Sequence, residues 1–286
     1  MYLGISSSLA HNSPEDWAKK HKDLGLKSVV FPVDCTAGQE KIMAYKKAAE
    51  EAGLVIAEVG VWRNTLAADP AERAKWIDYA IEQLKMADRI GARCCVNVVG
   101  TPYGPRWDGG YRQNFSSEAW DMAVKMIQQI IDSANPANTK FSIESMPWMI
   151  PSGPDEYLRL MKAVDRPQFG AHLDVVNMIT SPERYFFNDT FLDQCFEKLG
   201  DQICSCHLKD IRLKEEYTFQ LQECACGQGS LDIPRYIRLA SAVRDDMPMI
   251  IEHLNTDEEY IESVKWIASS ILPDNSHTLH CATYQP

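Results

Sequence analysis

The chain has 286 residues, of which 45% are hydrophobic, and a formal net charge of −11. This length allows two average domains or one large α/β barrel, and the hydrophobic content is sufficient for a large core. The acidic charge opposes binding to nucleic-acid phosphates, and the chain has no run of about 18 apolar residues that could cross a membrane.

The N-terminal sequence Met-Tyr-Leu-Gly-Ile-Ser lacks the basic and apolar regions of a secretory signal, so we expect a cytoplasmic protein. The nine cysteines are an odd number and lie at predicted strand ends and loops. We therefore interpret them as reduced thiols rather than as a disulfide framework or a zinc site.

Short apolar runs that are typical of buried strands recur along the chain. They predict strands at Tyr2–Ser7, Ser28–Val33, Leu54–Trp62, Cys94–Val99, Phe141–Glu144, Phe169–Asp174, Ile203–His207 and Pro248–Leu254. Helix signals separate these runs, with Ser, Asp or Gly followed by Pro at several starts and Gly at several ends. They predict helices at about 14–24, 39–52, 70–90, 117–133, from 154, 188–199, from 233 and 257–271.

Strands and helices thus alternate in one continuous series, which indicates a parallel sheet with right-handed crossovers. Eight such units can close into a barrel. Since no Pro/Ser-rich linker divides the series, we predict one (β/α)8 TIM barrel domain over residues 1–286, with a polar tail from about 273. An open doubly wound sheet is the alternative, but its Gly-x-Gly-x-x-Gly turn is absent. Long loops are predicted at Gly100–Asn114 and Ile211–Ser230.

Four of the predicted strands end in a residue that can bind a metal ion. Glu144, Asp174, His207 and Glu252 each follow a short apolar run. A carboxylate at the end of a buried strand is costly unless it is paired. The C-terminal ends of barrel strands share one face, and neighbouring strands are about 4.8 Å apart. These four side chains therefore predict one cation site with oxygen and nitrogen ligands.

Two other interpretations of these residues stay open. Each residue taken alone is equally consistent with metal binding and with a buried polar side chain that is paired with an arginine or a backbone amide. Glu144 and Glu252 are also of the type that flanks the scissile bond in a glycosidase. A hydrolase keeps its two carboxyl groups free of metal, however, and here Asp174 and His207 lie between them in strand order.

The chain resembles the xylose-isomerase-like barrel family of sugar isomerases and epimerases over roughly Tyr2 to Ile271. The resemblance rests on the four residues above, on His207-Leu-Lys-Asp210 and on Gly227-Gln228-Gly229, where the family has Gly-Glu-Gly. It implies that Glu144, Asp174, His207 and Glu252 bind a divalent metal. Mn²⁺ is the first choice, with Mg²⁺, Co²⁺ or Zn²⁺ as alternatives.

The endonuclease branch of this superfamily binds three zinc ions with additional histidines. This chain has Asn177 three residues after Asp174, and no further histidine lies between His207 and the Gly-Gln-Gly turn. These absences and the acidic charge argue against a nucleic-acid partner. Ketose epimerases have a substrate-binding histidine at the position of Asn177. We therefore place Asn177 among the substrate-binding candidates, and its identity argues against a free ketose.

Three further candidate substrate contacts come from the third and fourth strands. Glu58 and Trp62 are predicted at the end of the third strand, and Asn97 lies in the fourth. They face the same barrel mouth if the predicted register holds. Core packing or a loop cap is the alternative interpretation for these three residues.

The remaining substrate-binding candidates are His172, Trp107 and Lys209. His172 lies two residues before Asp174, one layer deeper, where a hydrogen-bonded core histidine is the simpler interpretation. Trp107, in the first long loop, could stack on a sugar face. Lys209 could hold a carboxylate or act as an acid near the metal.

The implied chemistry is proton transfer next to a carbonyl group. A bound cation would polarise the carbonyl of a sugar, and Glu144 or Glu252 would remove the neighbouring proton to give an enediolate. Returning the proton to the same carbon gives epimerisation, and returning it to the next carbon gives isomerisation.

Two alternatives to a sugar isomerase or epimerase are kept. A lyase that acts by β-elimination on 3-oxo-glycosides, such as the catalytic subunit of a C-glycoside deglycosidase, starts with the same proton abstraction. A metal-stabilised binding protein without turnover is the alternative from another class. We expect a small sugar or glycoside as ligand, no membrane partner, and either a homo-oligomer or a small β-sheet partner subunit.

Overall fold

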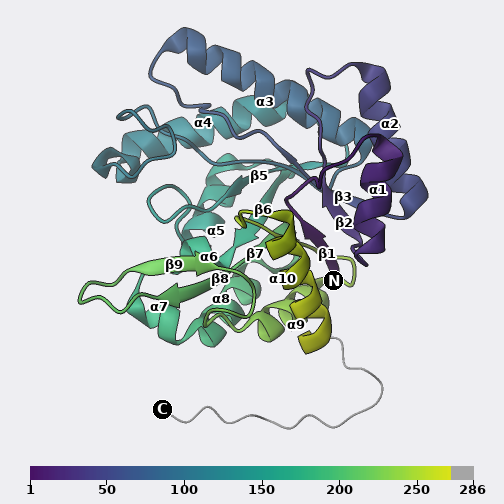
Figure 1. The fold of residues 1–286 in the computed structure, drawn as a ribbon. Helices are drawn as coiled ribbons and strands as arrows, with labels where there is room; N and C mark the ends of the chain where they lie inside the picture. The colour runs from purple at the N-terminus through teal and green to yellow at the C-terminus, as the bar shows by residue number, and fades with distance from the viewer. Residues whose placement is uncertain (272–286) are drawn as a thin grey trace.

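A computed structural model describes residues 1–271 and confirms the predicted barrel. Eight parallel strands form one sheet in the order β1-β10-β7-β6-β5-β4-β3-β2, with the helices outside it (Figure 1). The strands are β1 (Tyr2–Ile5), β2 (Ser28–Val30), β3 (Val55–Gly60), β4 (Cys94–Asn97), β5 (Lys140–Glu144), β6 (Phe169–Asp174), β7 (Ile203–Leu208) and β10 (Pro248–Ile251). Several of them end two or more residues earlier than predicted, and the predicted polar tail from 273 lies outside the described residues.

The two end strands of this sheet meet, so the barrel is nearly closed. The backbone N–H of Lys27 donates to the Leu3 carbonyl oxygen at 3.0 Å, and Ser28 Oγ donates to the Tyr2 carbonyl oxygen at 2.8 Å. On its other side, β1 pairs in parallel with β10 along its whole length. The C-terminal ends of the eight strands therefore surround a single mouth.

The helices follow the predicted capping signals closely. They are α1 (Pro14–Asp23), α2 (Gln39–Ala52), α3 (Pro70–Ile90), α4 (Ser117–Ala134), α5 (Pro154–Val164), α6 (Val175–Met178), α7 (Pro182–Phe186), α8 (Asn188–Leu199), α9 (Ile233–Val243) and α10 (Asp257–Ile271), with 3-10 turns at Arg112–Phe115 and Gly200–Gln202. Ser13 and Asp69 cap α1 and α3 through their side chains, and Gly53 and Gly91 end α2 and α3 with φ of +74° and +77°. None of the described helices is long and apolar enough to cross a bilayer.

The apolar core lies between the strands and the surrounding helices, where Trp17, Phe141 and Tyr157 are fully buried. The interior of the barrel differs from this core because it contains buried polar side chains, among them Ser142 and Glu58. The eight cysteines within residues 1–271 are free thiols. The inside of the barrel therefore contains polar and charged side chains, whereas the outer face of the sheet packs against the helices and supplies the hydrophobic stabilisation.

The prediction of a structureless loop from Ile211 to Ser230 was wrong. This segment contains most of an antiparallel hairpin, which is formed by β8 (Asp210–Leu213) and β9 (Leu221–Cys224). The hairpin extends away from the barrel in Figure 1. Polar and apolar residues alternate in β8 (Asp-Ile-Arg-Leu), but β9 (Leu-Gln-Glu-Cys) has two polar residues in succession and lacks this two-residue period. The connection between them carries no Asn-Gly or Asp-Gly turn signal, so the sequence pattern alone did not reveal the hairpin.

Asp210 holds the Gly227-Gln228-Gly229 turn against the end of the seventh barrel strand. Its Oδ2 accepts the backbone N–H groups of Gly227 and Gly229 at 3.0 and 2.9 Å, and its Oδ1 accepts those of Ile211 and Leu231 at 2.8 and 3.0 Å. A Cβ at position 229 would lie only 2.3 Å from Asp210 Oδ1, so only glycine allows this approach. The carboxylate thus fixes the hairpin and the following turn beside the mouth.

We expect Asp210→Asn to lower the free energy of unfolding by about 2–5 kcal/mol, because the amide NH₂ would face backbone donors and leave them without an acceptor. Urea unfolding followed by circular dichroism measures this change. Asp78→Asn, at an exposed position of α3, is the matched control and should change stability by less than about 0.5 kcal/mol. Equal stability of the two variants would show that Asp210 does not anchor the turn.

Candidate metal centre

The structure brings the four predicted metal ligands together at the barrel mouth. Glu144 and Asp174 are the last residues of β5 and β6, His207 lies near the end of β7, and Glu252 directly follows β10. All four side chains are buried, and one potential ligand atom from each lies within 4.8 Å of the others. They come from four strands that are neighbours in the sheet, so strand pairing itself sets their spacing.

The imidazole of His207 lies between the carboxylates. Its Nδ1 is 2.9 Å from Glu252 Oε2, 3.3 Å from Glu144 Oε1 and 3.9 Å from Asp174 Oδ2. Although burial opposes it, the carboxylates of Glu252, Glu58 and Glu144 raise the pKa of His207 well above its usual value. Glu144 and Glu252 thus approach the same ring nitrogen from two different strands.

These donors fit a divalent metal ion. Three buried carboxylates and one imidazole nitrogen form the mixed oxygen and nitrogen set that Mg²⁺, Mn²⁺ or Zn²⁺ accepts. Asp174 Oδ2 is paired with the Lys209 ammonium at 2.7 Å. The three carboxylates of the site nevertheless outnumber its two cationic side chains, His207 and Lys209, which leaves negative charge for an ion. Glu144, Asp174, His207 and Glu252 would hold the ion.

Lys209 places a buried ammonium group beside two of these carboxylates. Its Nζ lies 2.6 Å from Glu252 Oε1 as well as close to Asp174. Burial alone would lower the pKa of Lys209, but the carboxylates of Asp174 and Glu252 outweigh it and hold this pKa well above its usual value. Lys209 therefore carries a proton within hydrogen-bond distance of Glu252.

Glu58 forms a second polar layer beneath the candidate ligands. It lies inside β3 rather than at its end, and its side chain points into the barrel. Its Oε2 lies 3.2 Å from His207 Nε2, while its Oε1 lies 2.9 Å from His172 Nε2 and accepts the Ser205 hydroxyl at 2.5 Å. Burial would raise the pKa of Glu58, but His207 and His172 together hold it far below its usual value. Glu58 thus fixes the orientation of His207, as outer partners of metal ligands do.

His172 and Asn177 also contact this cluster. His172 is fully buried, one layer below Asp174, and within residues 1–271 its Nδ1 has no hydrogen-bond partner. Asn177, in the short helix α6, donates from Nδ2 to Glu144 Oε1 and to the Ser145 carbonyl oxygen, both at 3.0 Å. The asparagine at this position therefore orients the Glu144 carboxylate.

At the end of β3, the Asn97 side chain binds the backbone of Arg63, the residue that follows Trp62. The buried Asn97 amide accepts the N–H of Arg63 at 3.2 Å and donates to its carbonyl oxygen at 3.0 Å. Trp62 has a left-handed φ of +48°, which is rare for a bulky residue, and a Cβ on Gly60 would lie 1.9 Å from Trp62 Nε1. The indole therefore covers Gly60. Because Gly60 and Glu58 share a strand face, the indole lies on the mouth side of Glu58.

The structure adds two residues that the sequence analysis did not include. Glu223, on β9, lies 3.3 Å from Lys209 Nζ through Oε1 and 2.9 Å from His253 Nδ1 through Oε2. His253 follows Glu252 directly and has a left-handed φ of +58°. Glu223 had no signal in the sequence because the hairpin that carries it was predicted as a loop. Trp107, in contrast, lies away from the four ligands and lines a separate pocket.

We expect Glu58→Gln to weaken divalent metal binding about 10–100-fold, since the neutral amide no longer balances or orients His207. Titration calorimetry of the metal-free protein with Mn²⁺ measures the affinity. Ser205→Ala is the matched control, because it removes one hydrogen bond to Glu58 but keeps the carboxylate and its contact with His207. Unchanged metal affinity in Glu58→Gln would show that Glu58 does not support His207 as a metal ligand.

Metal binding should also weaken at acidic pH. Burial outweighs the nearby Lys209 ammonium and, with the carboxylates of Glu252 and Glu144, raises the pKa of Asp174 to about 7. Below that pH the ion must displace a proton from Asp174 in addition to the proton held by His207, so the apparent affinity should fall by up to about a hundredfold per pH unit. Calorimetric titrations at pH 6, 7 and 8, in two buffers of different ionisation enthalpy, detect both effects. A flat profile without proton release would contradict the prediction.

Several solved structures share the fold of this chain. A xylose isomerase-like TIM barrel protein from Mycobacterium smegmatis, in complex with magnesium, has 17% sequence identity and a TM-score of 0.67, with 90% of this chain and 88% of that chain covered. The 3-keto-D-glucoside 4-epimerase from E. coli, in its apo form, has 15% identity and a TM-score of 0.69, with 94% and 99% covered. A probable 3-DHS dehydratase involved in petrobactin synthesis in Bacillus anthracis has 16% identity and a TM-score of 0.70, with 94% and 100% covered.

No curated protein matches the chain. The family model described as xylose isomerase-like TIM barrel matches residues 18–270. This range includes the four candidate ligands and every barrel strand apart from β1. The chain belongs to the xylose isomerase-like TIM barrel family.

Proposed function

We propose that this protein is a divalent-metal-dependent isomerase or epimerase that transfers a proton at a carbon next to the carbonyl group of a sugar. The observation that carries the proposal is the arrangement of Glu144 and Glu252. These two buried glutamates lie on opposite sides of the strand pair β6 and β7 and both reach His207 Nδ1. A reaction that removes a proton and returns one needs two such groups.

The surroundings of the two glutamates suit different roles. Glu144 accepts a hydrogen bond from Asn177 and lies 3.3 Å from His207 Nδ1, and although burial opposes it, His207 lowers the pKa of Glu144. This carboxylate is ionised and oriented, as a base requires. Glu252 is also ionised, but it receives a hydrogen bond from Lys209 at 2.6 Å.

We assign proton removal to Glu144 and proton return to Glu252 with Lys209. In the first step the α-carbon loses its proton to Glu144, and the electron pair of the C–H bond moves toward the carbonyl oxygen. Lys209 transfers a proton through Glu252 to the carbon skeleton, and solvent then returns the proton held by Glu144 to Lys209. Delivery to the same carbon from the other side gives an epimer. Delivery to the former carbonyl carbon, together with transfer of the neighbouring hydroxyl proton to the former carbonyl oxygen, gives an isomer. The reverse reaction uses the same groups in the opposite order.

A divalent ion held by Glu144, Asp174, His207 and Glu252 would supply Lewis-acid polarisation of the substrate carbonyl. Mn²⁺ and Mg²⁺ both suit this donor set, and the Mycobacterium smegmatis protein with the same fold was described in complex with magnesium. The likeness of the fold to a 3-keto-D-glucoside 4-epimerase supports a carbohydrate substrate.

A lyase is the second candidate, and the position of Lys209 favours it. A buried, protonated lysine next to Glu252 is suited to protonate a leaving group β to the deprotonated carbon. In this reaction Glu144 takes the proton, a C–O bond or C–C bond breaks, and the leaving group receives the Lys209 proton. The likeness to a probable dehydratase supports this branch.

Solvent deuterium distinguishes the enzyme proposals from a binding protein without turnover. Sugars and 3-oxo-glycosides are incubated with the Mn²⁺-loaded protein in D₂O and examined by NMR and mass spectrometry. Isomerisation or epimerisation incorporates deuterium at a retained carbon, and elimination releases the leaving group as a separate product. Absence of exchange and of products with every such compound would refute both enzyme proposals.

We expect Glu144→Gln and Glu252→Gln each to reduce turnover about 10²–10⁴-fold while they keep a carbonyl ligand, because the amide cannot take or return a proton. Turnover and metal content are measured on the same preparations. Glu82→Gln, at an exposed position of α3, is the control and should keep full turnover. Near-normal turnover of Glu144→Gln at full metal occupancy would make Glu144 a ligand only and exclude it as the base.

A further inference from the structure

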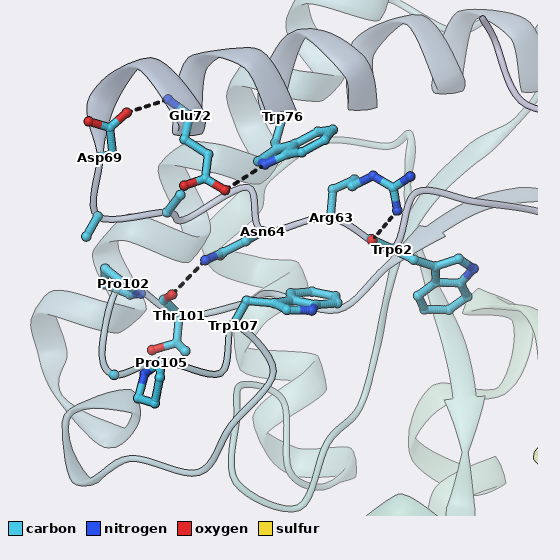
Figure 2. Close-up of a pocket in the computed structure, with 13 residues that line it drawn as sticks. Trp62, Arg63, Asn64, Asp69, Glu72, Trp76, Thr101, Pro102, Pro105 and Trp107 are labelled. Atoms are coloured by element: carbon cyan, nitrogen blue, oxygen red, sulfur yellow. Dashed lines mark hydrogen bonds between the residues drawn. The ribbon is translucent and has the colours of Figure 1, made fainter.

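A cavity of about 530 Å³ lies between the loops that follow β3 and β4 and the start of helix α3. We call it the outer pocket. Its lining includes Trp62, Arg63, Asp69, Glu72, Trp76 and Trp107 (Figure 2). Both loops leave the C-terminal ends of their strands, so the outer pocket opens on the same face of the barrel as the metal centre.

Trp107 contributes a partly exposed aromatic ring to the outer pocket. Its side chain is half-buried, and within residues 1–271 neither an aromatic ring nor a cation stacks on it and its indole N–H has no acceptor. Trp76 lies on the opposite wall in Figure 2, and its ring already has partners within the protein. The Arg63 guanidinium carbon lies 5.2 Å from the centre of this ring, and the indole N–H donates to Glu72 at 3.2 Å. A flat ligand would therefore stack on Trp107.

The charges of the outer pocket favour an uncharged ligand with hydroxyl groups. Its two carboxylates, Asp69 and Glu72, outnumber its single cation, Arg63. That guanidinium is already engaged by the Trp62 carbonyl oxygen at 2.9 Å and by the face of Trp76. A phosphate would meet net negative charge here, whereas sugar hydroxyls can donate to the carboxylates.

Trp62 lines the outer pocket and lies just beyond the end of strand β3 at the barrel mouth. The same residue covers Gly60, on the strand face that also carries Glu58. Its left-handed backbone is maintained by the two hydrogen bonds of Asn97 to Arg63. Strained conformations of this kind persist where the surrounding structure enforces them, and they concentrate at ligand sites.

We propose that the outer pocket is a subsite for the second ring of a glycoside, with Trp107 as its stacking surface. The inference rests on the proposed function: the sugar that carries the reacting carbonyl occupies the metal centre, and the group joined to its anomeric carbon extends past Trp62 into the outer pocket. The ligand of the outer pocket is an uncharged sugar or aryl ring. The preferred substrates are then glycosides rather than free or phosphorylated monosaccharides.

Two matched substrates test the proposal with the Mn²⁺-loaded protein, methyl and phenyl 3-oxo-β-D-glucopyranoside. We expect kcat/KM to be about tenfold higher for the phenyl compound, which corresponds to about 1.4 kcal/mol. Trp107→Ala should remove most of this preference, and Trp107→Phe should keep it. Trp120→Ala, which removes a half-buried indole of α4 outside the outer pocket, is the matched control and should keep it as well. Thermal melts by circular dichroism confirm that each variant is folded.

Binding of the non-reacting phenyl β-D-glucopyranoside separates this inference from the proposed function. We expect it to quench tryptophan fluorescence in the wild type and in Trp120→Ala but not in Trp107→Ala, whether or not the protein turns over any sugar. If the two oxo-glycosides react equally well and Trp107→Ala alters neither their kinetics nor the quenching, the outer pocket is not a subsite. If quenching requires Trp107 and no compound exchanges deuterium, the subsite stands and the proposed reaction falls.

Discussion

The structure depends on charge pairing inside a barrel that excludes water. An unpaired carboxylate in such a place costs several kcal/mol, so each buried acid needs a cation or a hydrogen-bond donor. His207 meets this need for several acids at once, because Nε2 faces Glu58 and Nδ1 faces the three carboxylates of the mouth. Lys209 serves Asp174 and Glu252 in addition. Removing one member would therefore disturb several others, and the cluster has to be understood as a unit.

The barrel could be predicted from the sequence because its signals are local. The helix at Pro70–Ile90 begins with an Asp-Pro cap and ends at a glycine, and the structure has the same boundaries. The β8–β9 hairpin escaped prediction because two strands of four residues joined by a connection without turn residues produce only a weak pattern. The short helices α6 and α7 escaped prediction for a related reason, since one or two turns carry little periodicity.

The candidate ligands could be located because each lies at or beside the end of an apolar run, and the barrel places all such ends on one face. The role of Glu58 could not be derived in this way. It was placed at the mouth together with Trp62, whereas in the structure it lies inside β3, two residues before the end of that strand and one layer deeper, beside His172 and Ser205. Glu223 reaches Lys209 only through the fold of the hairpin, so no local pattern could have revealed it.

The pairing of β1 with β10 has a consequence for how the protein is made. Strand β1 can pair along β10 only after all the elements between them have been synthesised, and such non-local contacts slow folding. Glu252 directly follows β10, so the fourth candidate ligand joins the other three in the same event that brings β10 and β1 together. A ligand that binds only the complete set would favour the closed barrel over partly folded chains by mass action. Supply of the ion during synthesis would then influence how much of the protein reaches its native state.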